Sequence, residues 1–168
     1  MDRRAIVIFP QFEQTALIEE LRRQFDPLAA LVPAHLTLVF PFDSDLPASH
    51  LAAHLHHVAH RTPPFDIRLQ EITVHEYAYL FLNVKRGNDH LVELHDRLYT
   101  GPLAAYRSRE QTYLPHLTVG RLDDRPTFRT ALHRAQRVTT AFETRVAEMA
   151  VYRIDTNGRR TVECVAPL

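Results

Sequence analysis

Two short segments of this chain carry residue types that acid–base chemistry needs. Each is a histidine followed by leucine and threonine, His35-Leu36-Thr37 and His116-Leu117-Thr118, inside an alternating apolar run that predicts a β-strand. Side chains two positions apart on a strand share one face and lie about 6–7 Å apart. Each segment therefore offers one imidazole and one hydroxyl to the same surface, while its leucine takes the opposite face.

The matched pair of triplets indicates a site more strongly than either triplet alone. With 11 histidines and 14 threonines, chance predicts roughly one His-x-Thr triplet in this chain. A third triplet, His60-Arg61-Thr62, serves as a control, because it precedes Pro63-Pro64 at a helix end and lacks apolar alternation. The other two are nearly identical and occupy the same place in two halves of the sequence.

Two imidazoles and two hydroxyls around one group suit in-line displacement at phosphorus. Histidine titrates near pH 6.5, so one ring can be neutral while the other is charged. We expect one of His35 and His116 to take a proton from the attacking oxygen and the other to give one to the leaving oxygen. Thr37 and Thr118 would donate hydrogen bonds to the non-bridging oxygens. This chemistry needs no metal and no cofactor.

Apolar periodicity and helix stop signals predict the elements that position the two motifs. The order is strand, helix, strand, helix, strand, then the same five elements again with one strand appended. Strands are expected near residues 4–9, 35–40, 66–75, 78–85, 116–119, 145–154 and 160–166, and helices near 13–25, 47–62, 88–100 and 126–135. This duplication predicts a first lobe at about 1–76 and a second at about 77–168, with an exchange of strands between them left open. A pseudo-twofold axis would bring both polar faces onto one groove.

Composition predicts one globular domain over residues 1–168. The chain has 168 residues with 45% hydrophobic and 24% charged side chains, which excludes general disorder. Twenty basic and twenty acidic residues cancel, so binding to long DNA is not expected. Lys85 is the only lysine, and no Walker loop surrounds it, so ATP-driven chemistry is not expected either.

The sequence also predicts a cytoplasmic protein that does not enter a membrane. No apolar run approaches the roughly 20 residues that span a bilayer, and the apolar stretch before Pro10 is too short for a signal peptide. Cys164 is the only cysteine, which excludes an intramolecular disulfide and a cysteine-built zinc site. Nothing in the sequence sets the oligomeric state.

The two motifs, about eighty residues apart on matched strands, resemble those of the two-histidine (2H) phosphoesterase superfamily. Within it the chain looks most like the bacterial 2'-5' RNA ligase and cyclic phosphodiesterase branch, whose second motif resembles the segment Pro115–Arg121. One departure is visible, because the first motif continues as Val39-Phe40-Pro41-Phe42 where many relatives have a run that ends in glycine.

The resemblance implies a bilobal α+β fold, with antiparallel sheets facing a central groove and helices outside. It implies a role in RNA processing, with a small nucleotide or an RNA end that carries a 2',3'-cyclic phosphate or a 2'-5' linkage as the substrate. His35 and His116 would be the acid–base pair, and Thr37 and Thr118 the phosphate ligands. Arg121 would be a supporting charge.

The residues themselves leave the role of Arg121 open. Its odd spacing from Thr118 turns it away from the motif unless the strand bulges at Gly120, and glycine in a strand often marks a bulge. The chain therefore predicts either a phosphate contact or an outward surface arginine.

Aromatic residues near the motifs have two interpretations. Phe40, Phe42 and Tyr113 could stack on a nucleotide base, or they could belong to the core. The segment Pro102–Leu114, which contains Arg107 and Arg109, is a long connection that could contact the flanks of a substrate.

The predicted helix at 47–62 is rich in histidine. Its histidines lie off the apolar stripe, which favours a solvated face over a metal-binding surface patch; they are His50, His54, His56, His57 and His60.

Three functions are open to the chain as a whole. The first is a metal-independent phosphodiesterase, and the second is the reverse activity, an ATP-independent RNA ligase. The third is a nucleotide- or RNA-binding module without catalysis.

Overall fold

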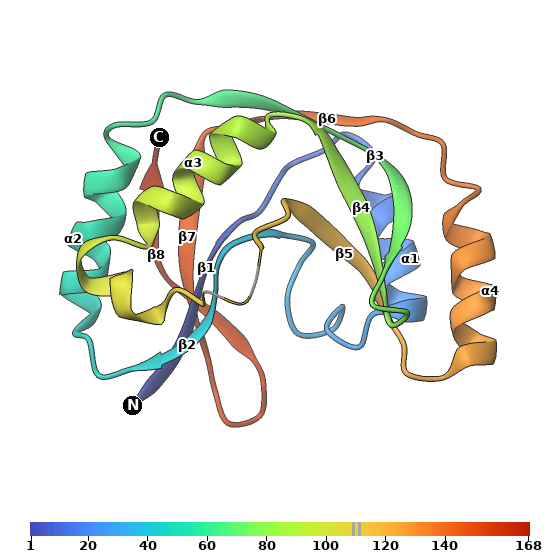
Figure 1. Cartoon of the computed structure of the whole chain (residues 1–168), viewed down its shortest axis with the longest axis horizontal. Coiled ribbons are helices and arrows are strands. Elements are labelled where there is room, and N and C mark those ends of the chain that lie inside the picture. Colours follow the sequence, from blue (N-terminus) through green and yellow to red (C-terminus); the bar gives the residue numbers. More distant parts are fainter. Residues whose placement is uncertain (109, 111) are drawn as a thin grey trace.

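The computed structural model describes residues 1–108, 110 and 112–168, which form one antiparallel sheet of eight strands with helices packed on it (Figure 1). The strand order across the sheet is β6-β3-β4-β5-β2-β1-β7-β8. The strands are β1 (Asp2–Ile8), β2 (Leu36–Ser44), β3 (Phe65–His75), β4 (Tyr79–Arg86), β5 (His116–Arg121), β6 (Phe142–Val146), β7 (Glu148–Ile154) and β8 (Arg160–Pro167). The helices are α1 (Thr15–Phe25), α2 (Ala48–Ala59), α3 (Asn88–Leu98), the 3₁₀ helix η1 (Gly101–Tyr106) and α4 (Arg125–Ala135).

The sheet consists of two groups of four strands that meet at its centre. One group is β6-β3-β4-β5, the other is β2-β1-β7-β8, and the pair Leu36 and Leu117 joins β2 to β5. The two sheets that the family resemblance implies are therefore one curled sheet, and the predicted α+β class with helices outside is confirmed. Both strands at the centre carry a motif.

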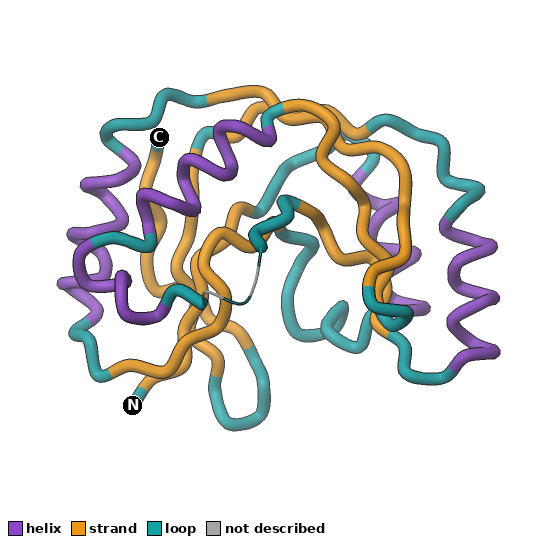
Figure 2. The backbone as a smooth tube through the Cα atoms, in the orientation of Figure 1, coloured by secondary structure: helices purple, strands orange, loops and turns teal. Residues whose placement is uncertain are grey.

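Each group takes elements from both halves of the sequence. Strand β3 lies between β4 and β6, whereas β7 lies between β1 and β8. Helix α1 packs on β5, and α3 packs on β2. Figures 1 and 2 show α2 and α3 at one end of the curled sheet and α1 and α4 at the other. The chain therefore crosses repeatedly between the two groups, and neither group is a continuous stretch of sequence.

The single strand predicted at residues 145–154 is wrong. Strand β6 ends at Val146 and pairs with β3, whereas β7 starts at Glu148 and pairs with β1 at the opposite side of the centre. Only Ala147 separates them, and no glycine or proline marks the change of partner. Two strands therefore follow the second set of five elements in place of one. The short helix η1 was also not predicted.

The two faces of the sheet are packed differently. Ile6 and Ile8 of β1 belong to the main core, which the helices cover, while Ala5 and Val7 belong to a small cluster on the other face. Val7 pairs with Thr37, so this small cluster lies on the same face as the first motif. We call this side of the sheet, opposite the main core, the motif face.

Candidate active site

The register at the centre of the sheet brings the two motifs together. Leu36 and Leu117 are paired and buried in the main core, so the residues on either side of them point to the motif face. Continuing this antiparallel register by one residue sets His35 opposite Thr118 and Thr37 opposite His116. The four side chains therefore alternate around one patch, with like residues on its diagonals.

Both histidines are held in the same tautomer by the same local bond. The Nδ1 of His35 lies 2.8 Å from the carbonyl oxygen of Pro33, and the Nδ1 of His116 lies 2.6 Å from that of Leu114. A carbonyl only accepts, so Nδ1 carries the hydrogen and donates it in each ring. The Nε2 of each neutral ring then presents a lone pair, which is the form that a general base requires.

Burial keeps both rings neutral in the free protein. It lowers the pKa of His35 below the ordinary value of 6.5, against the bond to Pro33, which raises it. Burial also lowers the pKa of His116 to about 4, with smaller contributions from the charges of His75 and His35. The charge of His35 acts on His116 because the two rings are near each other.

The two rings have different aromatic neighbours. His116 stacks on Phe81, with ring centroids 3.5 Å apart and planes 16° from parallel, and Phe81 in turn stacks on His75 at 4.7 Å. His35 meets two rings by their edges, Phe9 at 6.1 Å and Tyr152 at 6.0 Å. Each imidazole is thus fixed in orientation by rings on its own group of strands.

A buried ion network on α1 fixes the backbone that leads into His35. Arg22 is 1% exposed and pairs with Glu19 and Asp26. Its Nη2 also donates to the carbonyl of Val32, and Glu19 accepts from the backbone N–H of Ala34. These bonds lie on both sides of the carbonyl that accepts from His35. Sequence reasoning missed this network, since an Arg-Glu-Asp set at helical spacing reads as a surface pattern.

Three side chains form hydrogen bonds with the backbone of β2, past the residue where β2 pairs with β5. Tyr113 donates its hydroxyl to the carbonyl of Thr37 at 2.9 Å, and His95 donates Nδ1–H to that of Leu38 at 2.8 Å. The hydroxyl of Tyr99 accepts from the backbone N–H of Phe40. Tyr113 also stacks on His95 at 3.8 Å, so one face of its ring is covered. The sequence named Tyr113 only as a residue for stacking on a base or for the core, and it pointed neither to this backbone bond nor to the contribution of His95 from α3.

A β-bulge in β5 turns Arg121 to the motif face. Pairing with β4 sets Phe81 opposite Thr118 and Tyr79 opposite Arg121, which leaves Val119 as an extra residue on β5. The extra residue resets the alternation, so Arg121 faces the same side as Thr118. Its guanidinium carbon lies 5.6 Å from the centre of the Tyr79 ring.

Gly120 follows the extra residue and packs closely against Leu80 of β4. A Cβ at this position would lie 3.1 Å from Cδ1 of Leu80, closer than ordinary van der Waals contact. The sequence left open whether Arg121 faces the motifs or points outward, and in the structure it lies on the motif face.

The remaining aromatic candidates differ in exposure. Phe42 is 6% exposed and packs on Tyr106 in the main core, with ring centroids 4.9 Å apart. Of its two interpretations, the structure therefore has the core residue and not a ring that could stack on a base. Phe40 is half-buried and meets the edge of Tyr113 at 6.4 Å. In the long connection, Arg107 pairs with Asp96, and Arg109 lies outside the described residues.

The histidine-rich helix presents most of its imidazoles to solvent. His54 is half-buried and bonds the carbonyl of Leu98, and the other four are exposed: His50, His56, His57 and His60. Across residues 1–108, 110 and 112–168, no group of three or more histidine, cysteine or acidic side chains could hold a metal ion. No helix in the same residues is long and apolar enough to cross a membrane.

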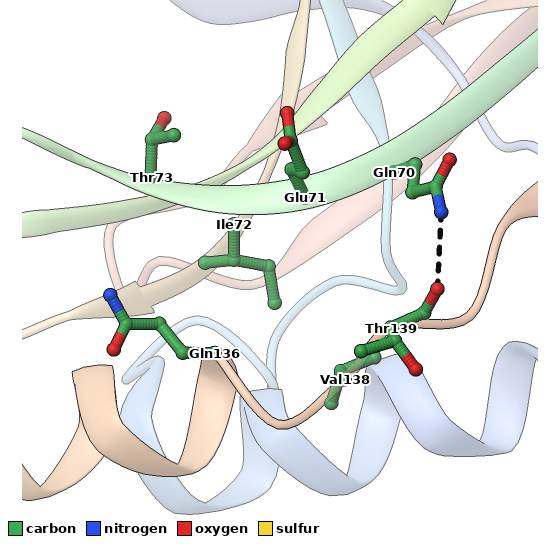
Figure 3. A pocket seen from close by; sticks show the side chains of 7 residues that line it. All are labelled: Gln70, Glu71, Ile72, Thr73, Gln136, Val138 and Thr139. Carbon is green, nitrogen blue, oxygen red and sulfur yellow. Dashed lines mark hydrogen bonds between the residues drawn. The ribbon is translucent and has the colours of Figure 1, made fainter.

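A hollow of about 290 Å³ lies between β3 and the segment after α4, away from the motifs (Figure 3). Its lining is mainly uncharged: Gln70, Glu71, Ile72, Thr73, Gln136, Val138 and Thr139. The amide of Gln70 spans it and donates to the carbonyl of Thr139. This lining offers no acid–base pair comparable to the two histidines.

The chain belongs to the 2'-5' RNA ligase superfamily, whose family model matches residues 9–158. A Geobacillus kaustophilus (strain HTA426) protein, named as a proposed phosphoesterase, is 32% identical over 118 residues, which cover 69% of this chain and 67% of that protein. A Geobacillus thermodenitrificans (strain NG80-2) protein with the same kind of name is 31% identical over 119 residues, at 69% and 67% coverage. The 2H phosphoesterase membership expected from the paired motifs is confirmed.

Solved structures show the same fold over the whole chain. TT0787 of Thermus thermophilus superposes with a TM-score of 0.68 at 20% identity, over 99% of this chain and 97% of that one. Apo LigT of E. coli superposes with a TM-score of 0.67 at 20% identity and the same coverage. E. coli LigT has also been crystallised with phosphate and with 3'-AMP.

Proposed function

We propose that this protein is a metal-independent phosphodiesterase that acts on 2',3'-cyclic or 2'-5' linked ribonucleotide phosphodiesters. The observation that carries the proposal is the central register, in which His35 and His116 occupy one diagonal of a patch and Thr37 and Thr118 the other. A phosphate above this patch meets an imidazole on two opposite sides. In-line displacement needs a base and an acid in that relation.

The reaction of a 2',3'-cyclic phosphate can be written with these groups. Nε2 of one histidine takes a proton from water while the water oxygen forms a bond to phosphorus. The bond from phosphorus to one ribose oxygen breaks, and the other histidine gives that oxygen a proton. The product is a phosphomonoester, and Thr37 and Thr118 donate to the non-bridging oxygens as charge develops.

Substrate binding supplies the proton that this mechanism needs. Both pKa values are lowered in the free protein, so at pH 7 both rings are neutral. A bound phosphate anion raises the pKa of the imidazole beside it, so the substrate binds together with a proton. We expect kcat/KM to rise as the pH falls below 7, since the fraction of protein with one charged ring increases.

The crystal structures of E. coli LigT with phosphate and 3'-AMP support a nucleotide substrate for this chain. The same acid–base pair works in both directions, so joining of RNA ends through a 2'-5' bond is the reverse activity. We place the protein in the cytoplasm, where both RNA ends and a reducing environment for Cys164 occur.

The test is turnover of a substrate panel in the presence of EDTA. The panel contains the four nucleoside 2',3'-cyclic phosphates, a 2'-5' linked dinucleotide and its 3'-5' linked isomer. Hydrolysis of cyclic or 2'-5' linked members in EDTA, with the 3'-5' isomer left intact, is the expected result. Loss of turnover on chelation contradicts the mechanism. Tight nucleotide binding without turnover, unchanged in His35→Ala, indicates the non-catalytic binding module instead.

A further inference from the structure

A second arginine, Arg160, lies on the motif face at the outer edge of the group β2-β1-β7-β8. Arg160 begins β8 and pairs with Ile154 of β7. Ile154 packs with Tyr152 in the small cluster on the motif face, so Arg160 shares that face. Tyr152 in this cluster is the residue whose ring meets the edge of His35, with the ring centroids 6.0 Å apart.

The turn before β8 fixes the position of this arginine. The carboxylate of Asp155 accepts from the backbone N–H groups of Asn157 and Arg159, and Gly158 takes a positive φ of 77°. Nη1 of Arg160 donates to the carbonyl of Gly158. The guanidinium is therefore held by its own hairpin and not by a carboxylate.

The missing counter-ion sets Arg160 apart from the other arginines with little exposure. Arg4 pairs with Asp2 and Glu163, and Arg22 pairs with Glu19 in its own helix and with Asp26 directly after it. Arg160 forms no ion pair with any acidic residue in the part of the chain that the structure describes, and its buried Nε has no hydrogen-bond partner there. A partly buried guanidinium in this state is a binding group for an anion.

Arg160 and His35 lie on the same face of the sheet, with Tyr152 of that face against the edge of the His35 ring. The positive charge of Arg160 is one of the causes that lower the pKa of His35, after burial and the charge of Arg22. An anion on Arg160 would therefore lie on the same face of the sheet as a phosphate held by the two motifs. In RNA, the group that carries a negative charge next to the terminal phosphate is the neighbouring phosphate on the 5' side.

We propose that Arg160 binds the 5'-side phosphate of the substrate, so that the protein prefers RNA ends and 5'-phosphorylated nucleotides over nucleoside cyclic phosphates. This inference rests on the proposed function for its position beside the reacting group. The group β2-β1-β7-β8, which carries the first motif, then contributes to substrate selection through Arg160, a residue outside both motifs.

The test compares binding of adenosine 3'-monophosphate and adenosine 3',5'-bisphosphate to wild type, Arg160→Gln and Arg159→Gln. Arg159 is exposed on the same hairpin, so its substitution removes the same charge without removing the proposed contact. We expect the bisphosphate to bind about tenfold more tightly than the monophosphate, the scale of a charge-assisted hydrogen bond. Arg160→Gln should reduce that ratio to about one, Arg159→Gln should keep it, and Arg160→Lys should keep part of it.

A ratio that Arg160→Gln leaves unchanged, or that both substitutions reduce equally, overturns the inference. If Arg160→Gln loosens the hairpin and lowers the melting temperature, Arg160→Lys, which keeps the charge but not the fork, still decides between a contact and a general charge effect. Binding does not depend on turnover, so a protein with no phosphodiesterase activity that shows the expected ratios refutes the proposed function alone.

Discussion

The two motif strands carry the same predicted reacting groups and the same bulge but differ in the residue beyond that bulge. In β2, Val7 pairs with Thr37 and Ile6 with Val39, so Leu38 is the extra residue, as Val119 is in β5. The next residue on the motif face is Phe40 in β2 and Arg121 in β5. The predicted reacting groups are thus matched, whereas the residue directly beyond the bulge is aromatic in β2 and charged in β5, and we expect this difference to favour one orientation of a substrate.

The largest effect should come from the histidines, where the two strands are alike. Replacing His35 or His116 by alanine removes a general acid or base and should lower kcat by roughly 10²–10⁴. Turnover of a 2',3'-cyclic nucleotide measures it, with His50→Ala on the exposed face of α2 as the control. If either variant is as active as wild type, the histidine that it lacks takes no part in the reaction.

The threonines should matter less and nearly equally. Thr37→Ala or Thr118→Ala removes one hydrogen-bond donor to a developing oxyanion and should lower kcat by about 10². Thr37→Ser and Thr118→Ser retain the hydroxyl and should recover most of the rate. A large loss in the serine variants would show that the methyl group, and thus packing, is what the site needs.

Arg121 tests the difference between the strands. Arg121→Gln should raise KM for a cyclic nucleotide about tenfold, the scale of one charge-assisted hydrogen bond, with a smaller effect on kcat. Phe40→Leu, at the matching position, should leave KM for the cyclic phosphate within about twofold of wild type. If both substitutions change KM by the same factor, the expected difference between the two strands is wrong.

The smallest effect concerns stability and pH. The pKa of His116 is about 4 in the folded protein and about 6.5 when unfolded, so the unfolded state binds more protons between these values. The free energy of unfolding should therefore fall as the pH drops from 6.5 to 4. Denaturant unfolding at several pH values should show a shallower fall for His116→Gln than for wild type. A parallel fall in both proteins contradicts the low pKa.

Short-range sequence patterns predicted most of the fold but not its connections. Periodicity located β2, β5 and their partners because each strand buries alternate residues locally. The change of partner at Ala147 has no local signature, since both β6 and β7 are ordinary strands whose neighbours are distant in sequence. The pairing of halves through Leu36 and Leu117 is likewise a long-range contact that the motif match only suggested.

The sequence pointed to the two triplets that the structure brings together, but it did not point to the residues that support them. The two triplets repeat, so they are visible in one sequence. Arg22 and His95 bond the backbone carbonyls of Val32 and Leu38, beside the first motif, and only folding brings these two side chains there. Arg160 reaches the motif face from a strand that the sequence set in the other half, and no spacing rule connects it to His35.

The central claim is that His35 and His116 act on one phosphodiester as a unit. The direct measurement is kcat for a 2',3'-cyclic nucleotide, in EDTA, for wild type, His35→Ala, His116→Ala and the double variant. Residues that act as a unit are strongly non-additive, so the double variant should be about as slow as the slower single variant. Two independent losses that multiply in the double variant, or a single variant that retains full activity, would contradict the account.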